Sequence, residues 1–425
     1  MPTFVNWAGN VRTEAASRQS PAAEAEVVAA VCAARESGRR VKVVGAGHSW
    51  SAIAAPEEVW LSVDALNHVG EVRDGLVTVG AGARLCDMVE ALAAQGYSPT
   101  ILGSIMEQRV AGAVATATHG SSLTHGNIAS AVRGMRLVDG RGEVVTLGPD
   151  DPRLPGARVH LGALGVVTEL TLAVEPLFYL REVRAPLPLG TAIERIDELA
   201  RGGEYVKWWW LPHTDQAVIF TYHRDPGPGR EPKLTRWMDE TLINRFIFPS
   251  MLAASRAVPG LTELQNRLVG ASYFSPAESV DRMDRQLTLA MPPAHREAEW
   301  LIPMEHAREG LERVVRLIED ALKVNFILEL RFIRGDDSWM STAYGGDRCA
   351  IGAYITDSRY QEAYFAQVAD ALRDLDARPH WGKEASFTPE DITRLYPEAE
   401  RWRGLARELD PDGLFRNRYL DAVLG

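Results

Sequence analysis

Apolar and polar positions follow two different periods along this chain, which predicts a mixed fold of helices and strands. Apolar residues recur at helical spacing between residues 20 and 38, where Ser20 and Pro21 are typical of a helix start and Gly38 of a helix end. The same spacing predicts a second helix from Leu85 to Gln95. Short apolar runs predict strands at 41–44, 59–63, 76–79 and 166–174, and a hairpin at 132–147.

The texture of the chain changes after Pro176, where aromatic residues gather in clusters such as Trp208, Trp209 and Trp210. Strands are predicted here at 205–210, 217–222, 326–333 and 349–355, and helices at 305–323 and 360–375. A chain of 425 residues exceeds the roughly 250–300 residues that one core supports, so we expect two domains. We divide the chain into a first domain, 1–176, a second domain, 177–378, and a return to the first domain, 379–425.

Composition and charge narrow the class of protein. The apolar share of 46% and the charged share of 24% are those of an ordinary globular protein, and the net charge of -11 disfavours a nucleic-acid partner. Cys32, Cys86 and Cys349 are far apart, which argues against a disulfide framework or a zinc site. The sequence contains neither a basic leader with an apolar core nor an apolar run of about 20 residues, so we expect a soluble, cytoplasmic protein with no membrane partner. The oligomeric state is left open.

The most informative stretch is Gly45-Ala46-Gly47-His48-Ser49-Trp50, directly after the apolar run 41–44. Glycines allow a sharp turn and a close approach to a ligand, and a strand ending in such a turn presents free N–H groups to a diphosphate. A phosphate loop has no need of an imidazole, so His48 indicates a further function at this turn.

Residues 100–122 are built mainly of glycine, alanine, serine and threonine, with little periodicity. A segment with so few large side chains makes no core of its own. It is either a surface loop or, as we favour, an irregular wrap around a flat ligand.

These stretches together carry a family resemblance. Gly45 to Ser49, Val110 to Ala113 and Thr116 to Gly120 resemble the FAD-binding half of the vanillyl-alcohol-oxidase superfamily, and His380-Trp381-Gly382-Lys383 resembles its aldonolactone oxidase and alditol oxidase branch. The resemblance runs from Asn6 to Asn417. It implies an α+β flavoprotein, with an FAD domain and a cap domain whose antiparallel sheet is flanked by helices.

The resemblance also implies how FAD is held. His48 matches the histidine that bonds covalently to the flavin, which raises the potential of the cofactor. Gly103 matches a position at the flavin edge where a small residue leaves room for dioxygen, which implies an oxidase that makes hydrogen peroxide. His380 and Trp381 are expected near the cofactor, whereas His119 is given no catalytic role. The cofactor-binding residues would be Val44, Gly45, Ala46, Gly47, His48, Ser49, Gly103, Ser104, Val110, Gly112, Ala113, Thr116, Thr118, His119, Gly120, Gly165, Val166, Val167, His380 and Lys383.

Glu329 and Arg331 alternate with Leu328, Leu330 and Phe332, so both charged side chains lie on one face of a predicted strand. Charges in such an apolar run are paired or line a pocket, and the alternative is a structural ion pair on an exposed face. The resemblance implies that Glu329 binds a substrate hydroxyl and that Arg331 lies near the reacting carbon.

Lys383 and Ser104 complete the predicted catalytic group, whose substrate contacts would be Ser104, Glu329, Arg331, Tyr354 and Lys383. Lys383 either stabilises negative charge or, with a pKa lowered by Arg331 and burial, takes the hydroxyl proton. Of the three tryptophans, at least one is expected in the core, and stacking on a sugar is the alternative for the others.

The chain departs from the family pattern at one wall of the pocket. Alditol oxidases carry a histidine and a threonine where this sequence has Gly352 and Tyr354. The sequence therefore predicts an FAD-dependent oxidase acting on a CH–OH group of an aldono-1,4-lactone or polyol, with dioxygen as acceptor. The alternatives are an aldonolactone dehydrogenase with another acceptor, an oxidase of a modified sugar or secondary-metabolite alcohol, and a flavin-free binding protein.

Overall fold

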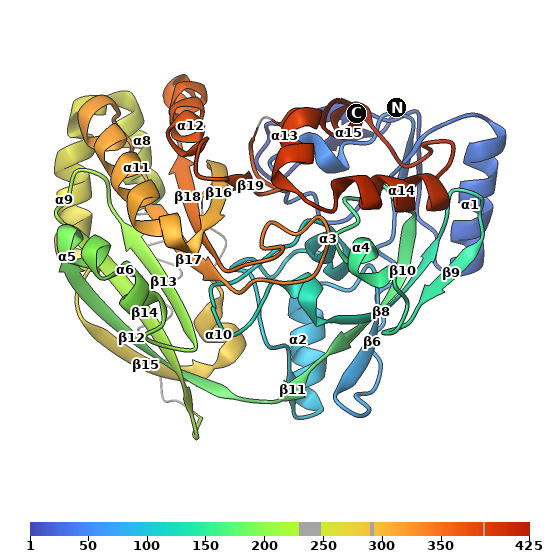
Figure 1. Ribbon diagram of the computed structural model, residues 1–425, viewed down its shortest axis with the longest axis horizontal. Coiled ribbons are helices and arrows are strands. Elements are labelled where there is room, and N and C mark those ends of the chain that lie inside the picture. Colours follow the sequence, from blue (N-terminus) through green and yellow to red (C-terminus); the bar gives the residue numbers. More distant parts are fainter. Residues whose placement is uncertain (229–247, 290–292, 386) are drawn as a thin grey trace.

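The protein forms two lobes that lie side by side, with both termini on the same lobe (Figure 1). The structure is a computed structural model that describes residues 1–228, 248–289, 293–385 and 387–425. None of the helices in these ranges is long and apolar enough to span a membrane.

The first lobe is built around two sheets. Strands β3, β5 and β4 pair in parallel, and β6, β10, β8 and β9 form an antiparallel sheet in that order. Two small two-stranded sheets, β1–β2 and β7–β11, lie outside them. The strands are β1 Thr3–Val5, β2 Arg12–Glu14, β3 Ser17–Gln19, β4 Val41–Val44, β5 Val59–Ser62, β6 Leu76–Gly80, β7 Tyr97–Ser98, β8 Val132–Val138, β9 Val144–Leu147, β10 Val166–Ala173 and β11 Glu175–Pro176; the helices are α1 Glu24–Glu36, α2 Leu85–Ala94, α3 Val110–Ala115 and α4 Leu154–Arg158.

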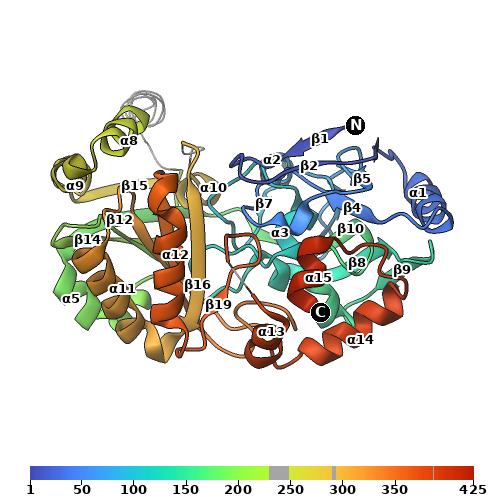
Figure 2. The same cartoon turned by 90° about the horizontal axis from the view of Figure 1, so that it is seen from above.

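The second lobe is one antiparallel sheet in the order β15-β12-β14-β13-β17-β18-β16-β19. Helices α5, α6, α11 and α12 cover one face of it (Figures 1 and 2) and enclose a core with Trp208, Trp210 and Phe332. The strands are β12 Tyr179–Pro188, β13 Tyr205–Trp210, β14 Gln216–Asp225, β15 Ala277–Arg282, β16 Arg296–Pro303, β17 Leu328–Ile333, β18 Arg348–Ile355 and β19 Arg378–Pro379; the helices are α5 Leu189–Glu194, α6 Ile196–Ala200, α8 Phe248–Ala257, α9 Thr262–Tyr273, α10 Met283–Leu287, α11 Ala307–Ala321 and α12 Ser358–Leu372.

After β19 the chain returns to the first lobe (Figure 2), where it forms α13 Pro389–Leu395, α14 Ala399–Leu409 and α15 Arg418–Leu424. The Asn417 amide donates hydrogen bonds to the carbonyls of Ala52 and Ala55, and Val41 N–H donates to Leu414. The tail is thereby fixed beside the strand that leads to His48.

The α+β architecture with an antiparallel second sheet is as predicted. Every strand predicted from apolar runs is present, within a few residues of its predicted bounds. The first helix begins at Glu24 instead of near Ser20, and Ala22 N–H, just before it, donates a hydrogen bond to Glu26 Oε2. The segment 100–122 was predicted to be irregular throughout, but it contains α3.

Candidate active site

The His48 turn joins three distant segments of the chain. Trp7 N–H donates to the carbonyl of Gly47, and Trp50 N–H donates to the carbonyl of Gly382. Gly47 has a φ of +70°, a conformation that glycine adopts without strain. The turn after β4 is thus held against both the N-terminus and the His380–Lys383 segment.

A cavity of about 840 Å³, counting its open mouth, lies beside this turn. Predicted cofactor residues that line it are Gly45, Ala46, Gly47, His48, Ser49, Gly112, Ala113, Thr116, Gly165 and Val167. Val44, Val110 and Val166 are buried in the core instead. Lys42 and His160 also line the cavity and were not predicted, although a lysine inside the apolar run 41–44 was a usable signal.

The cavity fits the diphosphate and ring system of FAD. The backbone amides of residues 46–49 donate no hydrogen bond to any described residue, so a ligand can take them. Burial lowers the pKa of His48, which favours the neutral, nucleophilic imidazole. Lys42 places a buried amine at the wall, where burial lowers its pKa to about 7.

Glu329 and Arg331 lie on the face of β17 that is opposite the helices, as the alternation predicted. Arg331 Nη2 is 2.8 Å from Glu329 Oε2 and donates to Ser104 Oγ at 2.7 Å. Arg331 Nη1 also donates to the carbonyl of His119 at 3.4 Å. The arginine therefore connects the cap sheet to the Ser104 loop and to the segment after α3.

Glu329 is held by three side chains and is only 4% exposed. Besides Arg331, Trp209 Nε1 donates to it at 2.9 Å and Tyr354 OH at 2.7 Å. Burial alone would raise the pKa of Glu329, but Arg331 and Lys207 lower it, so the carboxylate is ionised. Trp209 was left open by the sequence; it faces this site, whereas Trp208 and Trp210 are in the core.

Gly352 and Tyr354, where the chain departs from the family pattern, act together. A Cβ on Gly352 would lie 3.1 Å from Tyr354 Cε2, so the glycine makes room for the tyrosine ring. That ring stacks on Phe326 with centroids 5.6 Å apart and an interplanar angle of 16°. The result is an aromatic wall beside Glu329.

Lys383 has a partner that the sequence did not indicate. Its Nζ forms a salt bridge with Glu297 Oε2 and lies 4.3 Å from the centroid of the Trp50 ring. Arg331 was expected beside Lys383, but in the described residues its contacts are with Glu329, Ser104 and His119. The alternation of Glu297 and Glu299 with Ala298, Trp300 and Ile302 on β16 was the signal that could have revealed Glu297.

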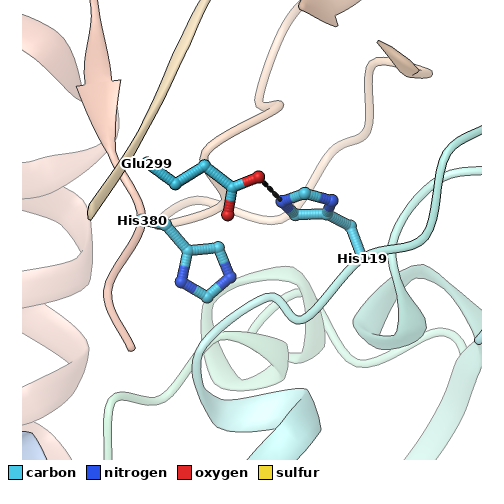
Figure 3. A group of neighbouring side chains, drawn as sticks. All are labelled: His119, Glu299 and His380. Atoms are coloured by element: carbon cyan, nitrogen blue, oxygen red, sulfur yellow. Dashed lines mark ion pairs between the residues drawn. The ribbon is translucent and has the colours of Figure 1, made fainter. Parts of the chain in front are cut away.

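His119, Glu299 and His380 bring the two lobes and the C-terminal return together (Figure 3), with ligand-type atoms within 4.8 Å of one another. His119 Nδ1 lies 2.9 Å from the carbonyl of Gly120 and its Nε2 lies 3.5 Å from Glu299 Oε1. Gly382 N–H donates to His380 Nδ1, and burial lowers the pKa of His380 to about 3, so its Nε2 carries the hydrogen. Although the residue types suit a metal ion, the ion pair between His119 and Glu299 joins the two lobes and makes the cluster an interdomain contact.

Trp381 was expected near the cofactor. It is fully buried and stacks on Phe387 at 4.9 Å, with its Nε1 donating to the carbonyl of Met340. It therefore anchors the His380–Lys383 segment in the core formed with the C-terminal helices.

Acid is expected to weaken the contact between the lobes. Burial alone would raise the pKa values of Glu297 and Glu299. The charges and hydrogen bonds of their neighbours, chiefly Lys383 for Glu297 and His119 for Glu299, together lower the pKa values by more than burial raises them, so both folded-state pKa values are depressed. The stabilisation is present above the unfolded pKa of about 4.3 and is lost as the pH falls toward about 2. The free energy of unfolding, measured with urea between these pH values, should depend less steeply on pH in Glu297→Gln than in the control Glu36→Gln, whose residue is exposed. Equal slopes would contradict a depressed pKa for Glu297.

Comparison with known proteins shows the family of the chain. The profile of the D-arabinono-1,4-lactone oxidase family matches residues 170–423, and an FAD binding domain profile matches residues 18–148. L-gulono-1,4-lactone dehydrogenase of Mycobacterium tuberculosis is 34% identical over 100% of this chain and 99% of its own length. Alditol oxidase of a Streptomyces species is 32% identical over 99% and 98%, and bovine (Bos taurus) L-gulonolactone oxidase is 28% identical over 99% and 98%.

Solved structures agree on the fold. Cholesterol oxidase of B. sterolicum superposes with a TM-score of 0.84 and 18% identity, covering 100% of this chain and 96% of that one. The resemblance stated from the motifs is confirmed, as are FAD as the cofactor and the two-lobed α+β flavoprotein fold. The chain therefore belongs to the D-arabinono-1,4-lactone oxidase family and is an FAD-linked oxidoreductase.

Proposed function

We propose that this protein oxidises a CH–OH group of a sugar-derived lactone or polyol, with dioxygen as the electron acceptor. The observation that carries the proposal is that Arg331 contacts both Glu329 on the second-lobe sheet and Ser104, which follows Gly103 in the first lobe. Family members that act on such substrates support it: the curated relatives are named for gulonolactone, arabinonolactone and alditol substrates.

In this mechanism Glu329, Ser104 and Tyr354 bind the substrate hydroxyls and orient the carbinol carbon. FAD, when bound, supplies the acceptor for the hydride of that carbon at N5. Arg331 and Lys383 stabilise the negative charge that develops on the substrate oxygen. The amine form of Lys383, whose own proton has left to solvent, accepts the hydroxyl proton, and the ammonium that results is stabilised by the carboxylate of Glu297.

Three further proposals concern the flavin bond, the domain division and the location of the protein. His48 carries the flavin covalently, which its position in the cavity wall supports. The division into 1–176, 177–378 and 379–425 is supported at its first boundary by the start of β12 at Tyr179, whereas its second boundary falls inside β19, at the edge of the second sheet. The protein works in the cytoplasm on small molecules, without nucleic-acid or membrane partners, which the net charge of -11 supports.

The test is an anaerobic screen of aldonolactones, polyols and aldoses that follows bleaching of the flavin absorbance, and then peroxide yield in air. We expect bleaching by lactones or polyols and one hydrogen peroxide per turnover. Rapid dye reduction without peroxide would support the dehydrogenase alternative, which the name of the Mycobacterium tuberculosis relative favours. A colourless protein that added FAD does not rescue would reject the enzyme altogether.

Gly103→Ala is expected to lower reactivity with dioxygen by about tenfold or more, with a smaller effect on substrate reduction. The added Cβ would lie 3.0 Å from Thr118 Cγ2 and 3.5 Å from the carbonyl oxygen of His119. It would therefore fill the space between Gly103 and these two residues. Stopped-flow mixing of reduced enzyme with oxygenated buffer measures the effect.

The double variant Gly103→Ala/Thr118→Ser is the matched control, because serine lacks the methyl group that the new Cβ would contact. If the double variant regains the wild-type rate with dioxygen, strain explains the single variant and the oxygen-access proposal for Gly103 is wrong.

A further inference from the structure

Lys207 is a buried amine that the mechanism above does not use. It lies on β13, directly opposite Arg331 of β17, and is 7% exposed. Its Nζ lies 5.2, 5.0 and 5.6 Å from the ring centroids of Trp209, Phe220 and Tyr222. No carboxylate among the described residues lies within salt-bridge distance of it. A buried lysine without a carboxylate partner lowers the stability of the fold. Its presence here therefore indicates a function for the amine.

A second, smaller cavity of about 310 Å³ lies against this amine. Its wall includes the apolar side chains of Ile101, Leu102 and Leu287 as well as the cations Lys207 and Arg331. Ser104, next to Gly103, is also in the lining. The cavity thus combines apolar side chains with two cations, and it shares Ser104 and Arg331 with the proposed substrate site.

We propose that this cavity is where dioxygen is held and reduced, and that Lys207 stabilises the superoxide anion formed there. The inference rests on the proposed oxidase function. The apolar wall accommodates the neutral diatomic molecule, and the ammonium stabilises the negative charge once the first electron arrives. One electron converts dioxygen to superoxide, and a second electron with two protons gives hydrogen peroxide. Both electrons and one proton come from the reduced cofactor, and the second proton comes from solvent.

Lys207 is favoured over Arg331 for this role because of their contacts. Arg331 is paired with Glu329 at 2.8 Å, so its charge is largely compensated. Lys207 Nζ lies among aromatic rings, and Glu182 and Glu329 act on it only from beyond salt-bridge distance, so its charge is less compensated than that of Arg331. Burial lowers the pKa of Lys207, and an anion formed beside it would raise that pKa again. Lys207 is therefore a functional residue of the oxidative half-reaction, distinct from the groups that bind the alcohol.

The test uses enzyme reduced with dithionite, so that it does not depend on knowing the substrate. Reduced wild type, Lys207→Met and the matched control Lys207→Arg are mixed with oxygenated buffer, and flavin reoxidation is followed. We expect the rate constant with dioxygen to fall at least about tenfold in Lys207→Met and to stay within about threefold of wild type in Lys207→Arg. Equal rates in wild type and Lys207→Met would overturn the proposal.

A second readout needs no turnover. Crystals of the wild type under xenon pressure are expected to show xenon in the cavity lined by Leu102, Leu287 and Lys207, because xenon occupies small cavities with apolar walls. An unoccupied cavity under these conditions would contradict a dioxygen site. Because this experiment uses the wild type, it remains a test even if Lys207→Met fails to fold. If no lactone or polyol bleaches the flavin while the reoxidation results hold, the substrate proposal fails and the oxygen site stands.

Discussion

Arg331→Met is expected to slow flavin reduction by about 100-fold or more and to lower the free energy of unfolding by roughly 3–5 kcal/mol. The guanidinium donates to Ser104 and pairs with Glu329, so its loss removes the charge beside the reacting oxygen. It also leaves a carboxylate that is 4% exposed without its cation. Anaerobic stopped-flow reduction and urea unfolding measure the two effects.

The double variant Arg331→Met/Glu329→Gln separates the two effects. It removes the uncompensated charge, so stability should recover in part while flavin reduction stays slow. A single variant that reduces its flavin at the wild-type rate would remove Arg331 from the catalytic group. If the double variant recovers both properties, Arg331 has only a structural role.

His48→Ala is expected to abolish covalent attachment of the flavin completely. The imidazole lines the cavity, and burial keeps it in the neutral form that can bond to the cofactor. Acid precipitation should give a yellow pellet from the wild type and a colourless one from the variant. The variant should also have a lower flavin potential, because the electron-withdrawing substituent is lost.

Ser49→Ala is the control for that experiment, since Ser49 lies in the same turn and lines the same cavity. It should keep its flavin through acid precipitation. A yellow pellet from His48→Ala would show that another residue forms the bond, and a colourless pellet from the wild type would show that no bond forms.

The residues that could be predicted from the sequence are those whose position follows from local geometry. Glu329 and Arg331 share a face because strands have a period of two, and the turn after β4 follows from its glycines. The motif order also placed Lys383 and Ser104 at the site, although their contacts had to come from the fold.

What the sequence did not reveal depends on contacts between distant segments. The partner of Lys383 is Glu297, 86 residues earlier, and the strand that carries it was not predicted. Which of the three tryptophans faces the site depends on the register between β13 and β17, which pairs Trp209 with Glu329. Lys207, like Lys42, is a lysine inside an apolar run, but the rings that surround its amine come from two strands and could not be named from the sequence.

A crystal structure of the protein with its flavin, solved with a bound aldonolactone, is the most direct test of the central claim. We expect a bond between a ring nitrogen of His48 and the flavin, and the lactone between the flavin and the side chains of Glu329, Arg331 and Lys383. A flavin bound elsewhere, or a lactone with no contact to those three side chains, would contradict this account.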